Sequence, residues 1–145
     1  MSLLSSLSVS ASGMSAERER AEVLVENIAN ADTTRTAEGG PYRRRDVVFQ
    51  SDTVSSPFSS VFQNQMDVQA KGVSVSDITV DNSEPERRYM PGHPDADKDG
   101  YVAMPRVNPA QDMVDLLGAS RSYQANVSAI SAVKDMIQKS IDLFR

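Results

Sequence analysis

The sequence contains no cysteine, no tryptophan and a single histidine, and aromatic residues make up only 6% of its 145 positions. Without cysteine, the chain forms no disulfide, no thiolate metal site and no cysteine nucleophile. The lone histidine, His93, does not supply a cluster of metal ligands and has no nucleophile near it in the sequence. No apolar run approaches the roughly 20 residues of a membrane-spanning helix, so membrane insertion is not expected.

The charge balance is acidic, with a formal net charge of -5 and a sequence pI of about 4.8. General nucleic-acid binders usually carry a basic surface, so no nucleic-acid partner is expected. The N-terminal stretch "MSLLSSLSVSASGMSAERER" lacks the basic start of a secretory signal, and serines interrupt its apolar residues. If the protein leaves the cytoplasm, it is expected to do so without a cleavable signal peptide.

The N-terminal region has the pattern of a long helix over residues 3–31. Apolar side chains recur every seven residues, at Leu7, Met14, Ala21 and Ile28. Leu24 widens this stripe. A seven-residue period is typical of helices that pack along a bundle or a coiled coil. Six of the first twelve residues are serines, which are indifferent helix formers, so this end is expected to be weakly ordered when alone.

The strongest helix signal in the sequence covers residues 108–144. Asn108 is suited to the N-cap and Pro109 to the first helical position. The expected apolar seam alternates steps of four and three, through Leu116, Ser120, Tyr123, Val127, Ile130, Lys134, Ile137, Ile141 and Phe144. Two members of this seam are polar, and Ala119 and Val133 lie beside these interruptions, where they would broaden the contact.

The middle of the chain differs from both ends and holds six of the seven prolines. Four short segments have strand composition: "RDVVFQ" (45–50), "VSVSDITVD" (73–81), "RRYM" (87–90) and "GYVAM" (100–104). The segments "SDTVSSPFSSVFQNQ" and "MPGHPDADKDG" between them are typical of loops.

These patterns predict a mainly α fold with a small β insertion. The long N- and C-terminal helices are expected to pair antiparallel as a coiled-coil-like unit, formed by residues 1–33 and 107–145. The β-rich segment 34–106 is expected to project from the end where the two helices open.

The segment "DADKDG" (95–100) resembles the opening of an EF-hand calcium loop, because three aspartates have the ligand spacing. The twelfth position of that loop would be Arg106, where calcium requires a bidentate glutamate. We therefore interpret the segment as an aspartate-rich turn that opens the next strand. No metal or other cofactor is expected, and His93 is assigned a structural or incidental role.

Polar residues gather at the end of the first expected helix. Asn30 is suited to closing the helix, since asparagine tolerates the left-handed conformation, and Asn27 either caps the last turn or bonds to a second chain. The run Arg43–Arg45 is interpreted as a charged strand edge that also pairs with an acidic neighbouring subunit.

Several long stretches resemble the family of bacterial flagellar rod and hook proteins. "ENIANADT" resembles the N-terminal signature of that family, and "GGPYRRRDVVFQ" resembles the segment that follows it in proximal rod proteins of the FlgC type. "PGHPDADKDGYVAMPRVNPAQDMVDLLGASRSYQANVSAISAVKDM" resembles their C-terminal half. The resemblance covers residues 1–50 and 85–145, with the motifs in the same order, whereas residues 51–84 match less.

The resemblance implies a structural subunit of the basal-body rod, with no enzymatic activity. In this family the terminal helices pack into an inner tube, and the first helix would end at Asn30 so that the chain leaves that tube. Export through the flagellar type III apparatus and a place in the periplasm-spanning basal body are implied. The residues alone leave open a soluble helical adaptor or export chaperone.

The partners that the resemblance implies are other proximal rod proteins, the distal rod protein, the adaptor between rod and MS ring, the export gate, and further copies of the chain. The residues expected to mediate assembly are Leu7, Met14, Ala21, Leu24, Asn27, Ile28, Asn30, Tyr42, Leu116, Tyr123, Gln124, Asn126, Val127, Ile130, Ile137 and Ile141.

Overall fold

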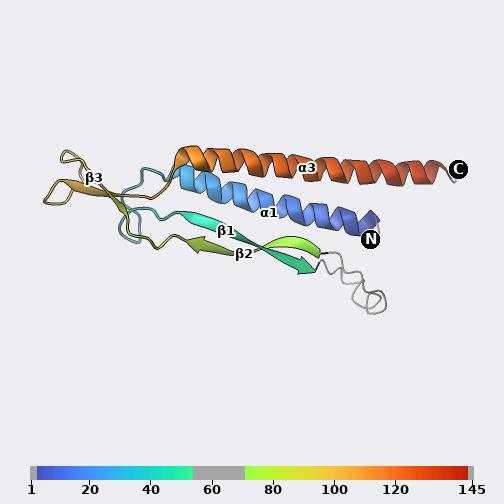
Figure 1. Cartoon of the computed structure of the whole chain (residues 1–145), viewed down its shortest axis with the longest axis horizontal. Coiled ribbons are helices and arrows are strands. Elements are labelled where there is room, and N and C mark those ends of the chain that lie inside the picture. The colour runs from blue at the N-terminus through green and yellow to red at the C-terminus, as the bar shows by residue number, and fades with distance from the viewer. Residues whose placement is uncertain (1–2, 54–70, 144–145) are drawn as a thin grey trace.

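The computed structural model describes residues 3–53 and 71–143, which form an elongated molecule (Figure 1). Helix α1 spans Leu3–Ala29 and helix α3 spans Pro109–Asp142. The strands between them are β1 (Arg45–Thr53), β2 (Lys71–Val80), β3 (Glu86–Tyr89) and β4 (Tyr101–Met104). The expected fold, mainly α with a small antiparallel β insertion, is confirmed. Most of the loop expected after β1 lies outside the described residues.

The two long helices lie side by side and run antiparallel, as expected (Figure 1). They approach closely at Gly13, where an added Cβ would lie 3.0 Å from Nδ2 of Asn126 on α3. A Cβ at this position would require the Asn126 side chain to shift, whereas glycine leaves room for that side chain against α1.

The β1–β2 hairpin folds back along α1, which makes α1 the central layer between α3 and the hairpin (Figure 1). The strands pair from Arg45 opposite Val80 to Thr53 opposite Lys71, with an irregularity after Val48. The Val73 amide donates a 3.1 Å hydrogen bond to Ser12 Oγ of α1.

The β insertion was expected to project from the helices, and only the β3–β4 pair does so (Figure 1). The β1–β2 hairpin differs because alternation places Val47, Phe49, Val73 and Val75 on one face, which requires cover from water. Helix α1 supplies part of that cover, since Val47, Val73 and Val75 are half-buried while Phe49 stays 38% exposed.

The buried face of α1 agrees with the expected stripe only at Leu24. The buried side chains are Ala16, Val23, Leu24 and Asn27. The expected seam of Leu7, Met14, Ala21 and Ile28 is only half-buried. Because α1 packs against α3 on one side and the hairpin on another, its buried region lies between the two contacts and a single stripe does not describe it.

The seam predicted for α3 is half correct. Leu116, Ile130 and Ile137 are half-buried, but the fully buried positions beside them are Asp112, Ala119 and Val133. Tyr123, Val127 and Ile141, which were expected in the seam, are exposed. The contact thus uses Ala119 and Val133 in place of their neighbours Ser120 and Lys134. This choice leaves the hydroxyl and the ammonium in water, where they need no buried partner. Phe144 lies outside the described residues.

Within residues 3–53 and 71–143, no helix is both long and apolar enough to span a bilayer.

Candidate functional site

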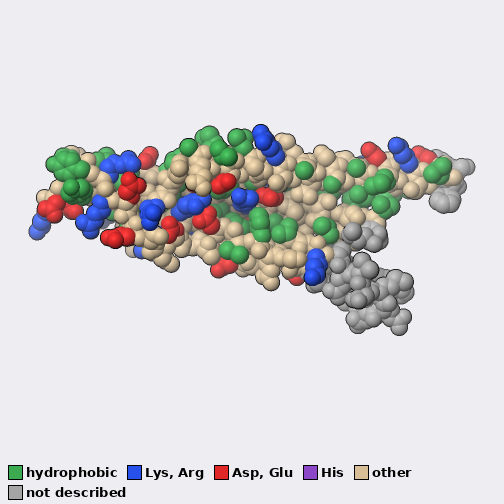
Figure 2. Space-filling view, viewed as in Figure 1, with side chains coloured by type: hydrophobic (Ala, Val, Ile, Leu, Met, Phe, Trp, Pro, Cys, Tyr) green, Lys and Arg blue, Asp and Glu red, His purple; other side chains and the backbone are tan. Residues whose placement is uncertain are grey.

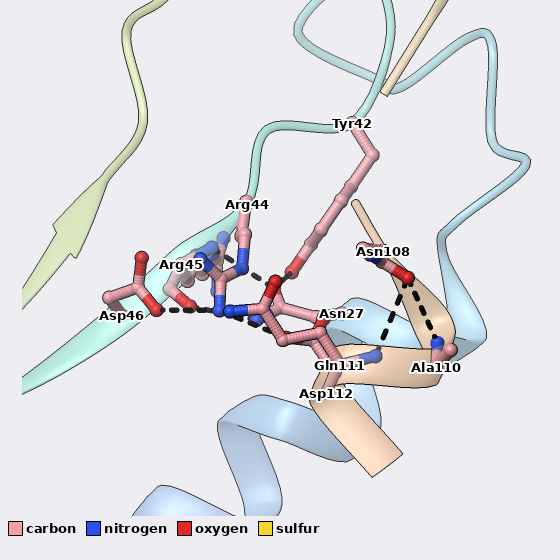
Figure 3. A network of polar contacts seen from close by, with 9 residues as sticks. All are labelled: Asn27, Tyr42, Arg44, Arg45, Asp46, Asn108, Ala110, Gln111 and Asp112. Carbon is pink, nitrogen blue, oxygen red and sulfur yellow. Dashed lines mark hydrogen bonds and ion pairs between the residues drawn. The ribbon is translucent and has the colours of Figure 1, made fainter. Parts of the chain in front are cut away.

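A network of polar side chains joins the end of α1, the segment entering β1 and the start of α3 (Figure 3). At its centre lies Asn27, whose side chain is 0% exposed. Asn27 Nδ2 donates to the Arg45 carbonyl oxygen at 2.8 Å, and its Oδ1 accepts from the Arg45 amide at 3.0 Å. The side-chain amide thus pairs with both backbone groups of Arg45 as a neighbouring strand would, which requires a donor and an acceptor on one short side chain.

Tyr42 donates its hydroxyl to the same Asn27 Oδ1, at 2.9 Å (Figure 3). Burial raises the pKa of the Tyr42 phenol above its ordinary 10.0, and this effect outweighs the opposing charge of Arg45. The carboxylates of Glu26 and Asp112 raise it further. The phenol therefore stays protonated at neutral pH and keeps its hydrogen bond to Asn27.

Arg44 and Asp112 form an ion pair between the β1 entry and the first turn of α3. Arg44 Nη2 lies 2.9 Å from Asp112 Oδ1 and 3.2 Å from Asp46 Oδ1. The Asp112 side chain is 1% exposed, and its Oδ2 makes no hydrogen bond within the described residues. The arginine and the positive end of the α3 dipole both stabilise this buried charge.

Helix α3 begins at Asn108, which confirms the predicted N-cap. Asn108 Oδ1 accepts from the Ala110 and Gln111 amides at 3.2 and 3.4 Å, and Pro109 occupies the first helical position (Figure 3). The cap fixes where α3 starts and hence where Asp112 meets Arg44.

Of the two asparagines of "ENIAN", Asn30 has the role expected of it and Asn27 does not cap the helix. The prediction that Asn27 caps the last turn is wrong, since its side chain bonds to Tyr42 and Arg45. The alternative, a bond to a second chain, stays a prediction. Asn30 closes the helix as expected, through a 2.9 Å bond from Nδ2 to the Glu26 carbonyl oxygen. The expected left-handed conformation is wrong, because no described residue other than glycine has a positive φ.

The structure agrees with one part of the interpretation of the arginine run. Arg43 and Arg45 are exposed, as expected of a solvated strand edge, and their side chains also have partners within the chain. Pairing with an acidic neighbouring subunit stays a prediction. Arg45 Nη1 lies 3.4 Å from Glu26 Oε2, and Arg43 donates to Asn82 Oδ1 at 2.6 Å. One sequence signal could have indicated the pairing: Asp112 lies seven residues before Ala119, so a carboxylate falls on the buried stripe of α3 and requires a cation.

The aspartate-rich turn before β4 is confirmed. Asp97 Oδ1 accepts from the amides of Asp99 and Tyr101 at 3.0 and 2.8 Å, and Gly100 adopts φ +80°. His93 accepts through Nδ1 from the Asp95 amide at 3.2 Å. Within residues 3–53 and 71–143, no three His, Asp or Glu side chains are placed to hold a metal ion.

The residues expected to mediate assembly are therefore divided between two places. Asn27 and Tyr42 meet in the polar network (Figure 3). Asn30 lies one helical turn further along the chain and bonds to the Glu26 carbonyl oxygen. The others are distributed along the two helices, where Gln124 and Val127 point outward and Asn126 meets α1.

Comparison with known proteins assigns the chain to a family. Residues 7–35 match the family described as flagella basal body rod protein, and residues 98–143 match the C-terminal region of the flagellar basal body rod FlgEFG proteins. The FlgC basal-body rod protein of Bacillus subtilis is 44% identical over 150 residues, which cover 99% of both chains. The FlgC proteins of Borreliella burgdorferi and Salmonella typhimurium are 38% and 37% identical, over 100% and 99% of this chain and 99% and 98% of their own. On this similarity the chain belongs to the FlgC family of flagellar basal-body rod proteins.

Proposed function

We propose that this chain builds the proximal part of the flagellar rod by burying its two long helices between neighbouring subunits, and that the resulting shaft transmits torque. Its family makes it a structural subunit of the basal-body rod that assembles with other rod components, and not an enzyme, an adaptor or an export chaperone. The proposed neighbours are other proximal rod proteins, the distal rod protein and the adaptor to the MS ring. Delivery through the export gate without a cleavable signal peptide is part of the same proposal.

The observation that supports this proposal is a stretch of both helices that is nearly uncharged and that is largely exposed on α3. Residues 3–16 of α1 carry no charge, and residues 116–133 of α3 carry only Arg121. In Figure 2 this part of the surface is tan and green, while blue and red gather on either side of it. Helices that stay in water usually carry charged residues on their outer face.

The same stretch exposes large apolar side chains in the single chain. Leu117 is 56%, Val127 42% and Tyr123 41% exposed. Fully burying one such side chain contributes roughly 1.5–3 kcal/mol, and the surrounding serines and alanines allow helices to approach closely. Enclosure by further helices therefore suits this surface better than water does.

The experiment places a carboxylate in the helix contact with Ile130→Asp, a half-buried position of α3. In a strain that makes only this variant, we expect normal synthesis and secretion but no completed rod, because each subunit repeats the same buried unpaired charge. The readouts are electron microscopy of purified basal bodies and swimming.

The control for this experiment is Glu22→Gln, which removes an exposed charge whose pairing with Arg18 contributes little. It should leave rods and swimming unchanged. Intact rods with Ile130→Asp would show that this part of α3 faces water in the assembly, and the proposal would be wrong.

A further inference from the structure

A groove runs along α1 between the β1–β2 hairpin and α3. Both of these elements pack on α1 but not on each other, so the space between them stays open. Two cavities of about 300 and 340 Å³ form the groove. Their floor comes from successive turns of α1, including Val9, Gly13, Ala16, Arg20 and Val23. Phe49 lines both cavities, so they adjoin.

The groove contains an acceptor that lacks a donor. Glu17 lines the larger cavity with a side chain that is 17% exposed. Its Oε2 is buried and makes no hydrogen bond within the described residues, and the Arg20 guanidinium is 4.0 Å away. A buried acceptor without a partner is unfavourable, so an occupant that brings a hydrogen-bond donor to Glu17 is preferred.

The chain itself carries a ridge with the matching chemistry on the outer side of α3. The ridge consists of Met113, Leu117, Gln124 and Val127, all of them exposed. Gln124 makes no side-chain hydrogen bond within the described residues, and its amide group can donate to a carboxylate. The ridge carries no charge that would be left unpaired in the groove.

The ridge and the groove also agree in length. From Val9 to Leu24 the floor extends about 22 Å, and from Met113 to Val127 the ridge extends about 21 Å, at 1.5 Å per helical residue. The α3 residues that line the groove, Asp115 and Asn126, lie on another side of the helix from the ridge. One chain therefore cannot place its own ridge in its own groove.

We propose that the α3 ridge of a second copy of this chain occupies the groove, with Gln124 of that copy donating to Glu17. The contact joins two different surfaces, so each copy keeps a free ridge and a free groove after pairing. Such head-to-tail contacts continue into open helical arrays. This inference rests on the proposed function, since it identifies one subunit contact within the rod.

The test uses cysteine cross-linking, because each introduced cysteine is the only thiol in its chain. Two differently tagged full-length copies, one with Glu17→Cys and one with Gln124→Cys, are expressed together in a strain that lacks the native subunit. When the two copies enter the array in equal amounts and at random, about half of the Glu17→Cys grooves hold a Gln124→Cys ridge. Oxidation of isolated basal bodies should therefore convert up to about half of each monomer into a dimer that carries both tags. The control pair is Glu22→Cys with Gln124→Cys; Glu22 is 66% exposed, so these monomers should remain.

The outcomes separate this contact from the proposed function. Absence of the chain from isolated basal bodies would contradict the proposed function itself. Intact rods that contain both copies without the dimer, or a cross-link to a different rod protein identified by mass spectrometry, would overturn only the groove assignment. If the Glu17→Cys copy does not assemble, Lys71→Cys takes its place, since Lys71 is an exposed residue of the same cavity.

Discussion

Asn27 and Asn30 are the same residue type one turn apart on α1, yet their replacement by alanine should have very different consequences. Asn27→Ala removes three hydrogen bonds at a fully buried position and leaves the Arg45 amide, the Arg45 carbonyl and the Tyr42 hydroxyl without that partner. Asn30→Ala removes a bond to the Glu26 carbonyl oxygen and one from Thr33, at a site that water reaches.

The difference follows from the number of bonds and from burial. A hydrogen bond inside a protein contributes about 1 kcal/mol net, and a buried group left without a partner costs a further 1–3 kcal/mol or so. Three bonds, with partial access of water to the groups left behind, give a loss of about 4 kcal/mol for Asn27→Ala. Water replaces the partners of Asn30, so that variant should lose about 1 kcal/mol, as for a helix cap.

The assay is urea unfolding of the full chain, followed by the circular dichroism of the helices, with amide hydrogen exchange of Arg45 as a local readout. Asn27→Ala should lower the unfolding midpoint far more than Asn30→Ala and should remove the protection of the Arg45 amide. If both variants unfold at the same urea concentration and the Arg45 amide stays protected in each, the polar network around Asn27 does not hold β1 on α1, and our account of this network is wrong.

Three further outcomes are expected. Because burial raises the pKa of Tyr42 in the folded chain, the phenol's contribution to stability is complete below pH 10.0 and is lost as the pH rises through the folded pKa. In Tyr42→Phe, the free energy of unfolding should therefore fall less steeply with pH in this alkaline range. The same pH dependence in the variant and the native chain would contradict the prediction. Gly100→Ala should destabilise the β3–β4 turn by about 1–2 kcal/mol, since φ is +80° and the new Cβ would lie 2.9 Å from the Tyr89 ring; a thermal melt equal to that of the native chain would refute this. Amide exchange along α1 should be faster in residues 3–12 than in residues 13–29, because the fully buried side chains lie in the second range, and uniform exchange would count against it.

The sequence was sufficient to predict which elements exist. Helix α3 has a capping asparagine, a proline at its first position and apolar residues through its length, and these local signals agree with one another. Strand β2 was predicted by alternation, the segments of β3 and β4 by their strand composition, and the turn before β4 by its aspartates. Such signals depend only on residues that are close in the sequence, so they can be recognised without knowledge of the rest of the fold.

The faces of the helices could not be predicted with the same success. On α3, apolar residues occur on both sides of Leu116 and Ile130, and periodicity alone does not say which side meets α1. The choice of Ala119 and Val133 over Val127 depends on the close approach at Gly13 and Asn126, which is a property of two helices together. The apolar residues left outside are those that our proposal assigns to neighbouring subunits.

The sequence indicated where the polar network around Asn27 lies, at the end of α1 and the start of β1, but not which side chains pair in it. Asn27 and Tyr42 were expected from the sequence to mediate assembly, and this stays a prediction. Arg44 and Asp112 were not paired in advance, because they are 68 positions apart and only the fold brings them within 2.9 Å. A mixed run such as Arg43–Asp46 is compatible with solvent, with a neighbouring subunit or with a buried partner. Nothing local to the run distinguishes these environments.

The polar network around Asn27 fixes the position of the hairpin where the apolar core is small. Within the described residues only seven hydrophobic side chains are fully buried, so packing alone constrains the position of the hairpin on α1 weakly. Apolar contacts tolerate a slip by one residue better than directional bonds do. The amide of Asn27 meets the amide and carbonyl of one residue, Arg45, and a slip of β1 along α1 would break both bonds at once. A subunit that repeats along a shaft needs the same hairpin position in every copy, and a buried polar network provides it where so few apolar side chains are available.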